Sequence, residues 1–261
     1  MEGEKSWSQK LLDACSTLTM APREWGAIFQ VRGLWRVELG MWNHYLFRFL
    51  PFDIFLATRQ SERPFSDFRF GETPYSTARK IFSWAEIGPH DRLLDLGCGR
   101  GKVVFTASCL GIPAIGIDLL AFYIKSARRI AAGLDPNCRP QFFQEDFLQA
   151  ELEGVSAIFV GGVALAEETR EDLLLLASTC EPGCKWITVG WDPNAGQQQV
   201  LLPGNDGLGL SYLRQQEFLF SWGREIVRLY RIEQSAQPRS SHSEAIEDYR
   251  PKQNLAGHNQ D

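Results

Sequence analysis

The sequence predicts an α/β protein with a mostly parallel sheet, helices on both faces of the sheet and a terminal antiparallel hairpin. Five short apolar runs of the kind that form buried parallel strands are spaced along the middle of the chain. Segments of helical period separate them, and this alternation is typical of a parallel sheet covered on both faces. Two further runs, YLRQQEFLF and EIVRLYRIE, flank SWGR with no helix between them, which indicates a hairpin.

The predicted parallel strands lie between residues 92 and 190. They are RLLDL, PAIGID, PQFFQED, SAIFVG and KWITVG. Helices are predicted after Gly101, over 120–130 and over 173–180, where apolar residues recur at three- and four-residue steps.

An aromatic-rich segment precedes this pattern. Apolar residues at three- and four-residue steps predict an amphipathic helix that ends at Pro51. Its longest uncharged run, Leu39 to Phe47, is far shorter than the roughly 20 residues that span a bilayer. Two interpretations are open: the apolar stripe packs on the rest of the protein or on a second copy, or it settles into a membrane interface. The stripe consists of Leu34, Trp35, Leu39, Trp42, Leu46, Phe49 and Leu50.

Composition divides the chain into three parts. Residues 1–62 form the aromatic-rich helical extension, and residues 63–233 form the α/β domain. Residues 234–261 are polar and poor in apolar anchors, so we expect a disordered tail.

The charge and the cysteines of the 261-residue chain limit its partners. A net charge of −5 argues against a nucleic-acid partner bound through a broad cationic surface.

The N-terminus, MEGEKSWSQK, lacks the apolar core of a secretory signal, so a cytoplasmic location is expected. Peripheral contact with a membrane through the aromatic-rich helix is a further expectation. Cys180 and Cys184 have no further Cys/His pair at zinc spacing, and no metal site is predicted.

The stretch LLDLGCGRGK, residues 93–102, carries the first predicted strand into a glycine-rich turn. A phosphate-binding P-loop requires glycine at 96 and Ser or Thr at 103, where the chain has Leu96 and Val103. The dinucleotide fingerprint requires glycine where the chain has Lys102, which then becomes an ordinary residue of the next helix. What remains is a G-x-G-x-G turn. Its glycines are Gly97, Gly99 and Gly101.

Three acidic residues, Asp95, Asp118 and Asp146, end successive predicted strands. Because the carboxyl ends of parallel strands meet at one edge of a sheet, these side chains are expected to line one crevice. A carboxylate before the glycine turn suits a cationic amine and would repel a pyrophosphate. The second carboxylate is placed for a ribose diol, and the third for an adenine amino group. Together they predict a pocket for S-adenosylmethionine.

These motifs, LLDLGCGRGK, Asp118 and QEDF, resemble those of class I S-adenosylmethionine-dependent methyltransferases over about residues 63–233. The resemblance implies a Rossmann-like methyltransferase fold, whose sheet has seven strands with the last one antiparallel. A narrower similarity is to the telomeric-silencing-disruptor type of histone lysine methyltransferase. It is carried by FGETPYSTARKIFSWAEIG, AIFVGGVAL and FSWGREIVRLYRI.

The resemblance also implies which residues bind the cofactor. The GETP stretch would fold over its methionine part, the end of the first strand would hold its amino acid end, and the later carboxylates would meet ribose and adenine. The GETP stretch has a second interpretation, since Thr73 suits a helix N-cap and Pro74 a first helical residue. The implied cofactor residues are Phe70, Glu72, Thr73, Asp95, Gly97, Gly99, Gly101, Asp118, Asp146 and Phe147.

One departure concerns the methyl acceptor. Gly161 and Gly162 stand where the histone enzymes carry two asparagines near the acceptor amine, and glycines offer only backbone carbonyls and room. Candidates for orienting the acceptor are Glu72, Tyr75 and the backbone of both glycines, and no single general base is predicted.

The acceptor itself has several interpretations. A protein lysine is one, a small molecule or lipid-linked acceptor is the alternative, and a non-enzymatic adenosyl-binding module is a third. Trp191 and Asp192, which follow the fifth predicted strand, either line the acceptor pocket or serve as packing anchors.

Overall fold

The computed structural model describes residues 20–45, 71–136, 139–161, 163 and 165–235. The predicted domain boundary at residue 62, the helix beyond residue 45 and the tail from residue 236 lie outside these residues. Phe70 and Gly162 do so as well.

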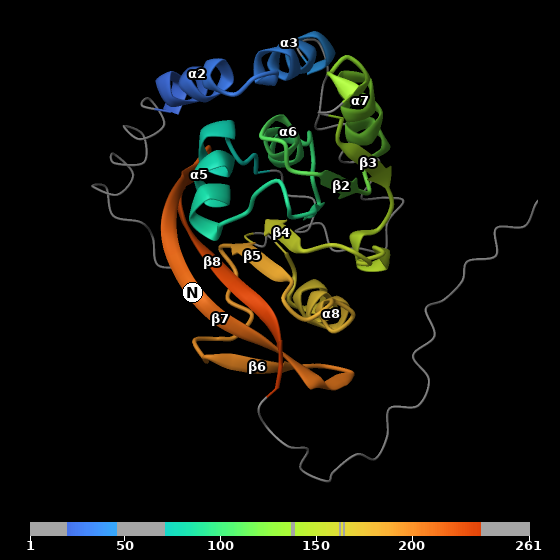
Figure 1. Cartoon of the computed structure of the whole chain (residues 1–261), viewed down its shortest axis with the longest axis vertical. Coiled ribbons are helices and arrows are strands. Elements are labelled where there is room, and N and C mark those ends of the chain that lie inside the picture. The colour runs from blue at the N-terminus through green and yellow to red at the C-terminus, as the bar shows by residue number, and fades with distance from the viewer. Residues whose placement is uncertain (1–19, 46–70, 137–138, 162, 164, 236–261) are drawn as a thin grey trace, which may run out of the picture.

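One sheet of eight strands runs through the domain in the order β3-β2-β1-β4-β5-β8-β7-β6 (Figure 1). Strands β1 to β5 pair in parallel, while β8 runs antiparallel to both β5 and β7. The predicted parallel sheet with a closing hairpin is therefore confirmed. The strands are β1 (Leu93–Leu96), β2 (Ala114–Asp118), β3 (Gln141–Gln144), β4 (Ala157–Gly161), β5 (Lys185–Val189), β6 (Gln199–Leu202), β7 (Asn205–Phe220) and β8 (Gly223–Gln234).

The sheet has one strand more than the seven that the resemblance implied. The additional strand, β6, pairs antiparallel with the first part of β7 at the edge of the sheet. Strand β7 is 16 residues long and pairs with β8 along one edge and with β6 along the other.

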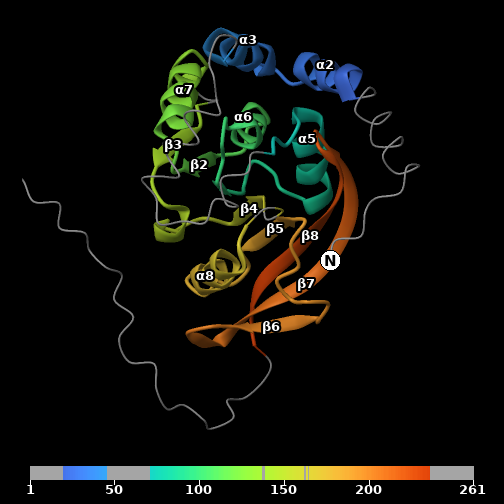
Figure 2. The same cartoon turned by 180° about the vertical axis from the view of Figure 1, so that it is seen from behind.

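Helices cover both faces of this sheet, as predicted (Figures 1 and 2). Alternate residues of one strand enter opposite cores: Leu93 packs with α5, α6 and α7, whereas Leu94 packs with α8. The helices are α5 (Tyr75–Ala85), α6 (Lys102–Cys109), α7 (Ala121–Ala132) and α8 (Glu167–Ala177), with a 3₁₀ turn, η3, at Phe147–Gln149.

Two N-terminal helices, α2 (Met20–Gln30) and α3 (Leu34–Tyr45), lie end to end as an outer layer. Helix α2 packs on α5, and α3 packs on α6 and α7. The buried face of α3 consists of Leu34, Val37 and Met41. Of the predicted apolar stripe, Leu34 packs inward as one interpretation expected, whereas Trp35, Leu39 and Trp42 are exposed, so this part of the stripe does not pack on the rest of the described chain. The remaining members lie outside the described residues.

A glutamate of this outer layer caps α5. Helix α5 has Pro74 at its N-cap position without a side-chain cap, which corrects the expectation of a Thr73 cap and a first helical Pro74. The carboxylate of Glu24 instead accepts the N–H groups of Tyr75 and Ser76 at 3.0 and 2.8 Å. A carboxylate at a helix N-terminus satisfies unpaired N–H groups and complements the helix dipole.

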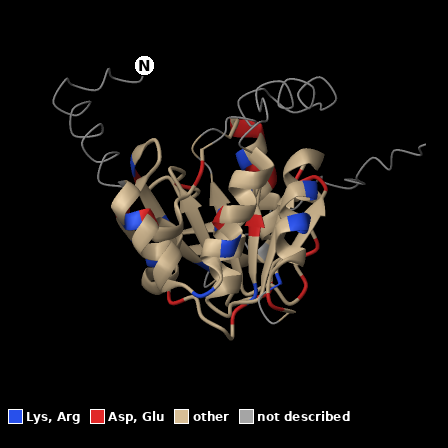
Figure 3. Ribbon diagram, turned by 90° about the horizontal axis from the view of Figure 1, so that it is seen from above, with Lys and Arg blue, Asp and Glu red and all other residues tan. Residues whose placement is uncertain are grey.

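The ribbon carries both basic and acidic positions, as Figure 3 shows. Within the described ranges, no helix combines the length and the apolar character needed to cross a bilayer. In the same ranges, no cluster of three or more His, Cys, Asp or Glu side chains is placed to hold a metal ion.

Candidate functional site

A cavity of about 400 Å³ opens at the carboxyl ends of β1, β2 and β4. Its walls come from the turn between β1 and α6, the turn after β2, the end of β4 and the segment that precedes α5. This is the edge at which parallel α/β sheets bind ligands.

The glycine turn after β1 is held by backbone bonds to β2. The N–H groups of Gly97 and Cys98 both donate to the carbonyl of Ile117, at 2.9 and 2.8 Å. Gly101 has a φ of +85°, and a Cβ there would lie 2.7 Å from the ring of Phe142. Both the backbone conformation and the close approach therefore require glycine at 101.

Asp118 joins this turn to the end of β2. Its two carboxylate oxygens accept the N–H groups of Gly99 and Leu120, each at 2.8 Å. Burial raises the pKa of the Asp118 carboxyl to about 6, and these two hydrogen bonds act against that rise.

Asp95 ends the neighbouring strand and is only 3% exposed. Burial, and after it the charge of Asp118, raise the pKa of the Asp95 carboxyl well above its ordinary value. Two carboxyls with raised pKa at the end of adjacent strands are typical of a functional site.

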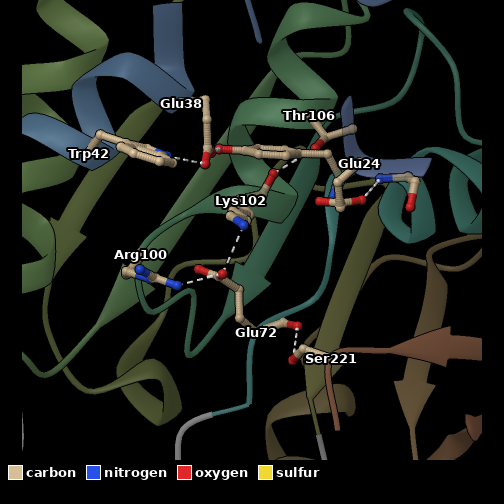
Figure 4. Close-up of polar contacts among 10 residues, drawn as sticks. Glu24, Glu38, Trp42, Glu72, Arg100, Lys102, Thr106 and Ser221 are labelled. Carbon is tan, nitrogen blue, oxygen red and sulfur yellow. Dashed lines mark hydrogen bonds and ion pairs between the residues drawn. The ribbon is translucent and has the colours of Figure 1, made fainter. Parts of the chain in front are cut away.

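The segment before α5 closes one side of the cavity. Glu72 forms ion pairs with Arg100 at 2.5 Å and Lys102 at 2.8 Å, and its carbonyl accepts the Ser221 hydroxyl at 2.9 Å (Figure 4). Gly71 lies against Trp222, whose ring a Cβ at Gly71 would approach to 2.8 Å. The segment is thus fixed between the glycine turn and the β7–β8 hairpin.

Most of the sequence-predicted residues meet at this cavity. Asp146 does not line it, and its carboxylate accepts the N–H of Leu148 at 3.0 Å as the cap of η3. Phe70 and Gly162 lie outside the described residues. The predicted residues that line the cavity are Glu72, Thr73, Asp95, Gly97, Gly99, Gly101, Asp118, Phe147 and Gly161.

Tyr75, a candidate for orienting the acceptor, is fully buried away from the cavity. Its hydroxyl donates to Glu38 at 3.0 Å. Burial and the charge of Glu38 raise the pKa of the Tyr75 hydroxyl well above its ordinary value, so it stays protonated and acts as a donor. Its role in this structure is to hold α3.

The two residues after β5 also lie elsewhere. Trp191 is buried in the core beneath α8, and Asp192 accepts the Tyr230 hydroxyl at 2.9 Å. Of the two interpretations of this pair, the geometry agrees with packing.

Sequence reasoning missed several residues of the cavity wall. Lys102, considered an ordinary helix residue, pairs with Glu72 and lies 4.6 Å from the centre of the Tyr75 ring. Arg100 adds a second cation, and its guanidinium lies 5.2 Å from the centre of the Tyr45 ring. Trp222 comes from the predicted hairpin turn. Basic residues inside a glycine-rich motif were the one local signal that pointed to these contacts.

Comparisons with known proteins agree on the fold. No family model matches the chain, and no curated protein matches it in sequence. The solved structure of TrmN from Thermus thermophilus superposes with a TM-score of 0.51 at 19% identity, over 67% of this chain and 55% of that one.

Two further structures are similar at lower scores. An RNA methyltransferase from Salinibacter ruber, in complex with S-adenosyl-L-homocysteine, has a TM-score of 0.48 at 19% identity, over 66% of this chain and 99% of that one. Magnesium protoporphyrin IX methyltransferase from Synechocystis PCC 6803 has a TM-score of 0.48 at 18% identity, over 60% and 78%. With the strand order and the helices on both faces, the chain has a methyltransferase-like α/β fold, as predicted.

Proposed function

We propose that the protein is an S-adenosylmethionine-dependent methyltransferase that acts on an apolar small molecule or a lipid-linked acceptor. Two observations support the use of this cofactor: the fold, and a cavity bordered by a glycine turn and two strand-end carboxylates. A volume of about 400 Å³ lies within the usual range for small-molecule sites.

The residues present fit this cofactor. Gly97 has a φ of +78°, and a Cβ there would meet no atom within 4 Å, so ligand atoms have room beside the turn. Asp118 and Phe147 both line the cavity, where the carboxylate would accept hydrogen bonds from ribose hydroxyls and the ring would pack against the adenine. When bound, the cofactor would supply a methyl group activated by its sulfonium. The chain would contribute alignment and the exclusion of water.

The observation that carries the acceptor proposal is the apolar wall beyond β4 and β5. It contains Phe159, Val163, Val189 and Trp222, together with the bare backbone of Gly161. An ammonium group would lose its hydration against these apolar side chains, which is costly, and Glu72, a carboxylate of the same cavity, is already paired with Arg100 and Lys102. An apolar acceptor avoids this desolvation cost.

A protein lysine is the second candidate, and Glu72 favours it. One carboxylate oxygen of Glu72 is buried and accepts no hydrogen bond from the described residues, so it offers an acceptor for an amine. The other oxygen is shared by Arg100 and Lys102, whose charges offset that of the carboxylate. For this reason we place the apolar acceptor first.

Radiolabel transfer tests the proposal. The full chain is incubated with cofactor labelled in its methyl group and with cell extract, and the products are divided into acid-precipitated protein, organic-soluble and aqueous fractions. We expect the label in the organic-soluble fraction, and we expect Asp118→Asn to remove most of it. Label in protein would support the lysine candidate. Tight cofactor binding with all of the label still on the unreacted cofactor in the aqueous fraction would support a binding module instead.

A further inference from the structure

The outer face of α2 and α3 is unusually apolar for a surface. It exposes Trp25, Phe29, Trp35, Leu39 and Trp42, each between 49% and 74% exposed. These are five of the nine large apolar side chains that the described residues expose, on two helices of 11 and 12 residues. Apolar side chains gathered in this way mark an interaction surface.

The exposed charged residues of the helices on this side have one sign, and the exposed carboxylates Glu86 and Asp135 lie beyond the C-terminal ends of α5 and α7. Within α2, α3, α5 and α7, and in the turn between the first two, every exposed charged residue is basic. Only two acidic residues occur there, and both bond to the N-terminal part of α5. Glu24 accepts N–H groups of Tyr75 and Ser76, while Glu38 accepts the Tyr75 hydroxyl and the Trp42 indole. The exposed basic residues are Arg23, Arg32, Arg36, Arg79, Lys80, Lys125, Arg128 and Arg129.

The opposite face of the molecule is acidic. Helix α8, on the other side of the sheet, exposes Glu167, Glu168, Glu171 and Asp172. The chain has a net charge of −5, so the basic character of the α2–α3 side reflects how the charges are distributed, not an excess of basic residues. A partner for this side must therefore be both anionic and apolar.

We propose that the outer face of α2 and α3 docks the protein on the surface of an anionic lipid bilayer. Trp, Phe and Leu side chains flanked by arginines are the composition that settles into the headgroup region of a membrane. Anionic headgroups complement the surrounding basic residues. This inference does not depend on the proposed methyl transfer.

A second copy of the chain fits this face less well. In a two-fold dimer this surface would face the same surface of the other copy, so its exposed arginines, among them Arg32 and Arg36, would be brought near arginines of that copy. Like charges at such a contact are unfavourable. No described acidic side chain on this face is placed to offset them.

Docking at this face would bring the cavity close to the lipid. Tyr45, the last residue of α3, lies against Phe122 and Arg100 and approaches Tyr123, and both Arg100 and Tyr123 line the cavity. The outer layer therefore ends beside the cavity wall.

Vesicle flotation with the full chain tests this proposal. The vesicles are either phosphatidylcholine alone or an equal mixture of phosphatidylcholine and phosphatidylglycerol. We expect flotation with the anionic vesicles and little with the neutral ones. The triple variant Trp25→Ser, Phe29→Ser, Leu39→Ser should bind the anionic vesicles on the order of 100-fold more weakly, because three apolar side chains that docking would remove from water are lost. Arg32→Gln should weaken binding about fivefold.

Matched variants separate docking from general effects. A control triple variant, Phe143→Ser, Leu201→Ser, Ile226→Ser, removes three exposed apolar side chains from other surfaces. A control single variant, Arg231→Gln, removes a charge from β8. Both control variants should float like the unchanged protein. Thermal melting confirms that the variants fold, since all altered side chains are exposed.

Three results would overturn the proposal. They are no flotation with either vesicle, equal flotation with both, and flotation that the triple serine variant retains. A dimer in light scattering that the triple variant abolishes would likewise overturn it, and would assign this face to a second copy.

Discussion

Cofactor affinity should depend on the ionisation of one carboxyl group, that of Asp118. Its two oxygens accept the N–H groups of Gly99 and Leu120, and burial raises its pKa to about 6. Ribose hydroxyls donate hydrogen bonds, so the ionised carboxylate is the form that should bind them. Affinity for S-adenosylhomocysteine should therefore fall as the pH is lowered through 6.

The size of the effect follows from that pKa. With a pKa of about 6, roughly ten-elevenths of the Asp118 carboxyl is ionised at pH 7 and roughly one-eleventh at pH 5. The apparent Kd should rise about tenfold between these values, which corresponds to about 1.4 kcal/mol. In Asp118→Asn the pH dependence should disappear. Affinity at pH 7 should fall by about 10- to 100-fold, because charge-assisted hydrogen bonds contribute about 1.5–3 kcal/mol.

Titration calorimetry between pH 5 and pH 8 measures this dependence. Asp192→Asn, a carboxyl bonded to Tyr230 away from the cavity, serves as the control and should keep the tenfold change. Asp95→Asn is measured in parallel, because burial also raises the pKa of Asp95. A Kd that is independent of pH in the unchanged protein, or a tenfold change that survives in Asp118→Asn, would refute the reasoning.

Three further outcomes are expected. Because the folded-state pKa of Asp118 lies above its ordinary 3.8, its stabilising contribution is present below pH 3.8 and lost as the pH rises through 6. Urea unfolding should therefore show stability falling, relative to Asp118→Asn, by about 2.4 kcal/mol between pH 4 and pH 7. Gly101→Ala, with a φ of +85° and a ring 2.7 Å from the new Cβ, should lower stability by about 2–4 kcal/mol. Gly183→Ala, with a φ of +96° and open space, should show only the backbone part, about 1–2 kcal/mol. Glu24→Ala should cost about 1–3 kcal/mol in thermal melting by removing the cap of α5, whereas exposed Glu153→Ala should cost almost nothing.

The sheet and the cavity edge were predictable because their signals are local. Each parallel strand is a short apolar run, and topology alone brings the ends of such strands together. Asp95 and Asp118 therefore meet as predicted, although they are separated along the chain by a whole helix. The turn between Gly97 and Gly101 could be predicted for the same reason, since its glycines are close in sequence.

The N-terminal layer was not predictable in the same way. Helix α3 carries apolar residues on two sides, so periodicity alone does not decide which side is buried. The structure buries Val37 and Met41 and exposes Trp35 and Trp42. The cap that Glu24 provides depends on a contact across 51 residues, and no local pattern contains it.

Glu24 and Glu38 connect the outer layer of α2 and α3 to the wall of the cavity. Their bonds to α5 hold the outer layer beside the segment that carries Thr73 into the cavity. The same bonds engage the only two carboxylates of that layer, since Glu24 accepts N–H groups of α5 and Glu38 accepts both the Tyr75 hydroxyl and the Trp42 indole. The contacts that anchor the two helices therefore also engage the acidic groups of the layer, and the charged residues that α2 and α3 leave exposed are basic. Tyr75→Phe, which removes the hydroxyl that donates to Glu38, would loosen the layer and at the same time leave the negative charge of Glu38 less engaged beside the face where an anionic membrane is expected to bind.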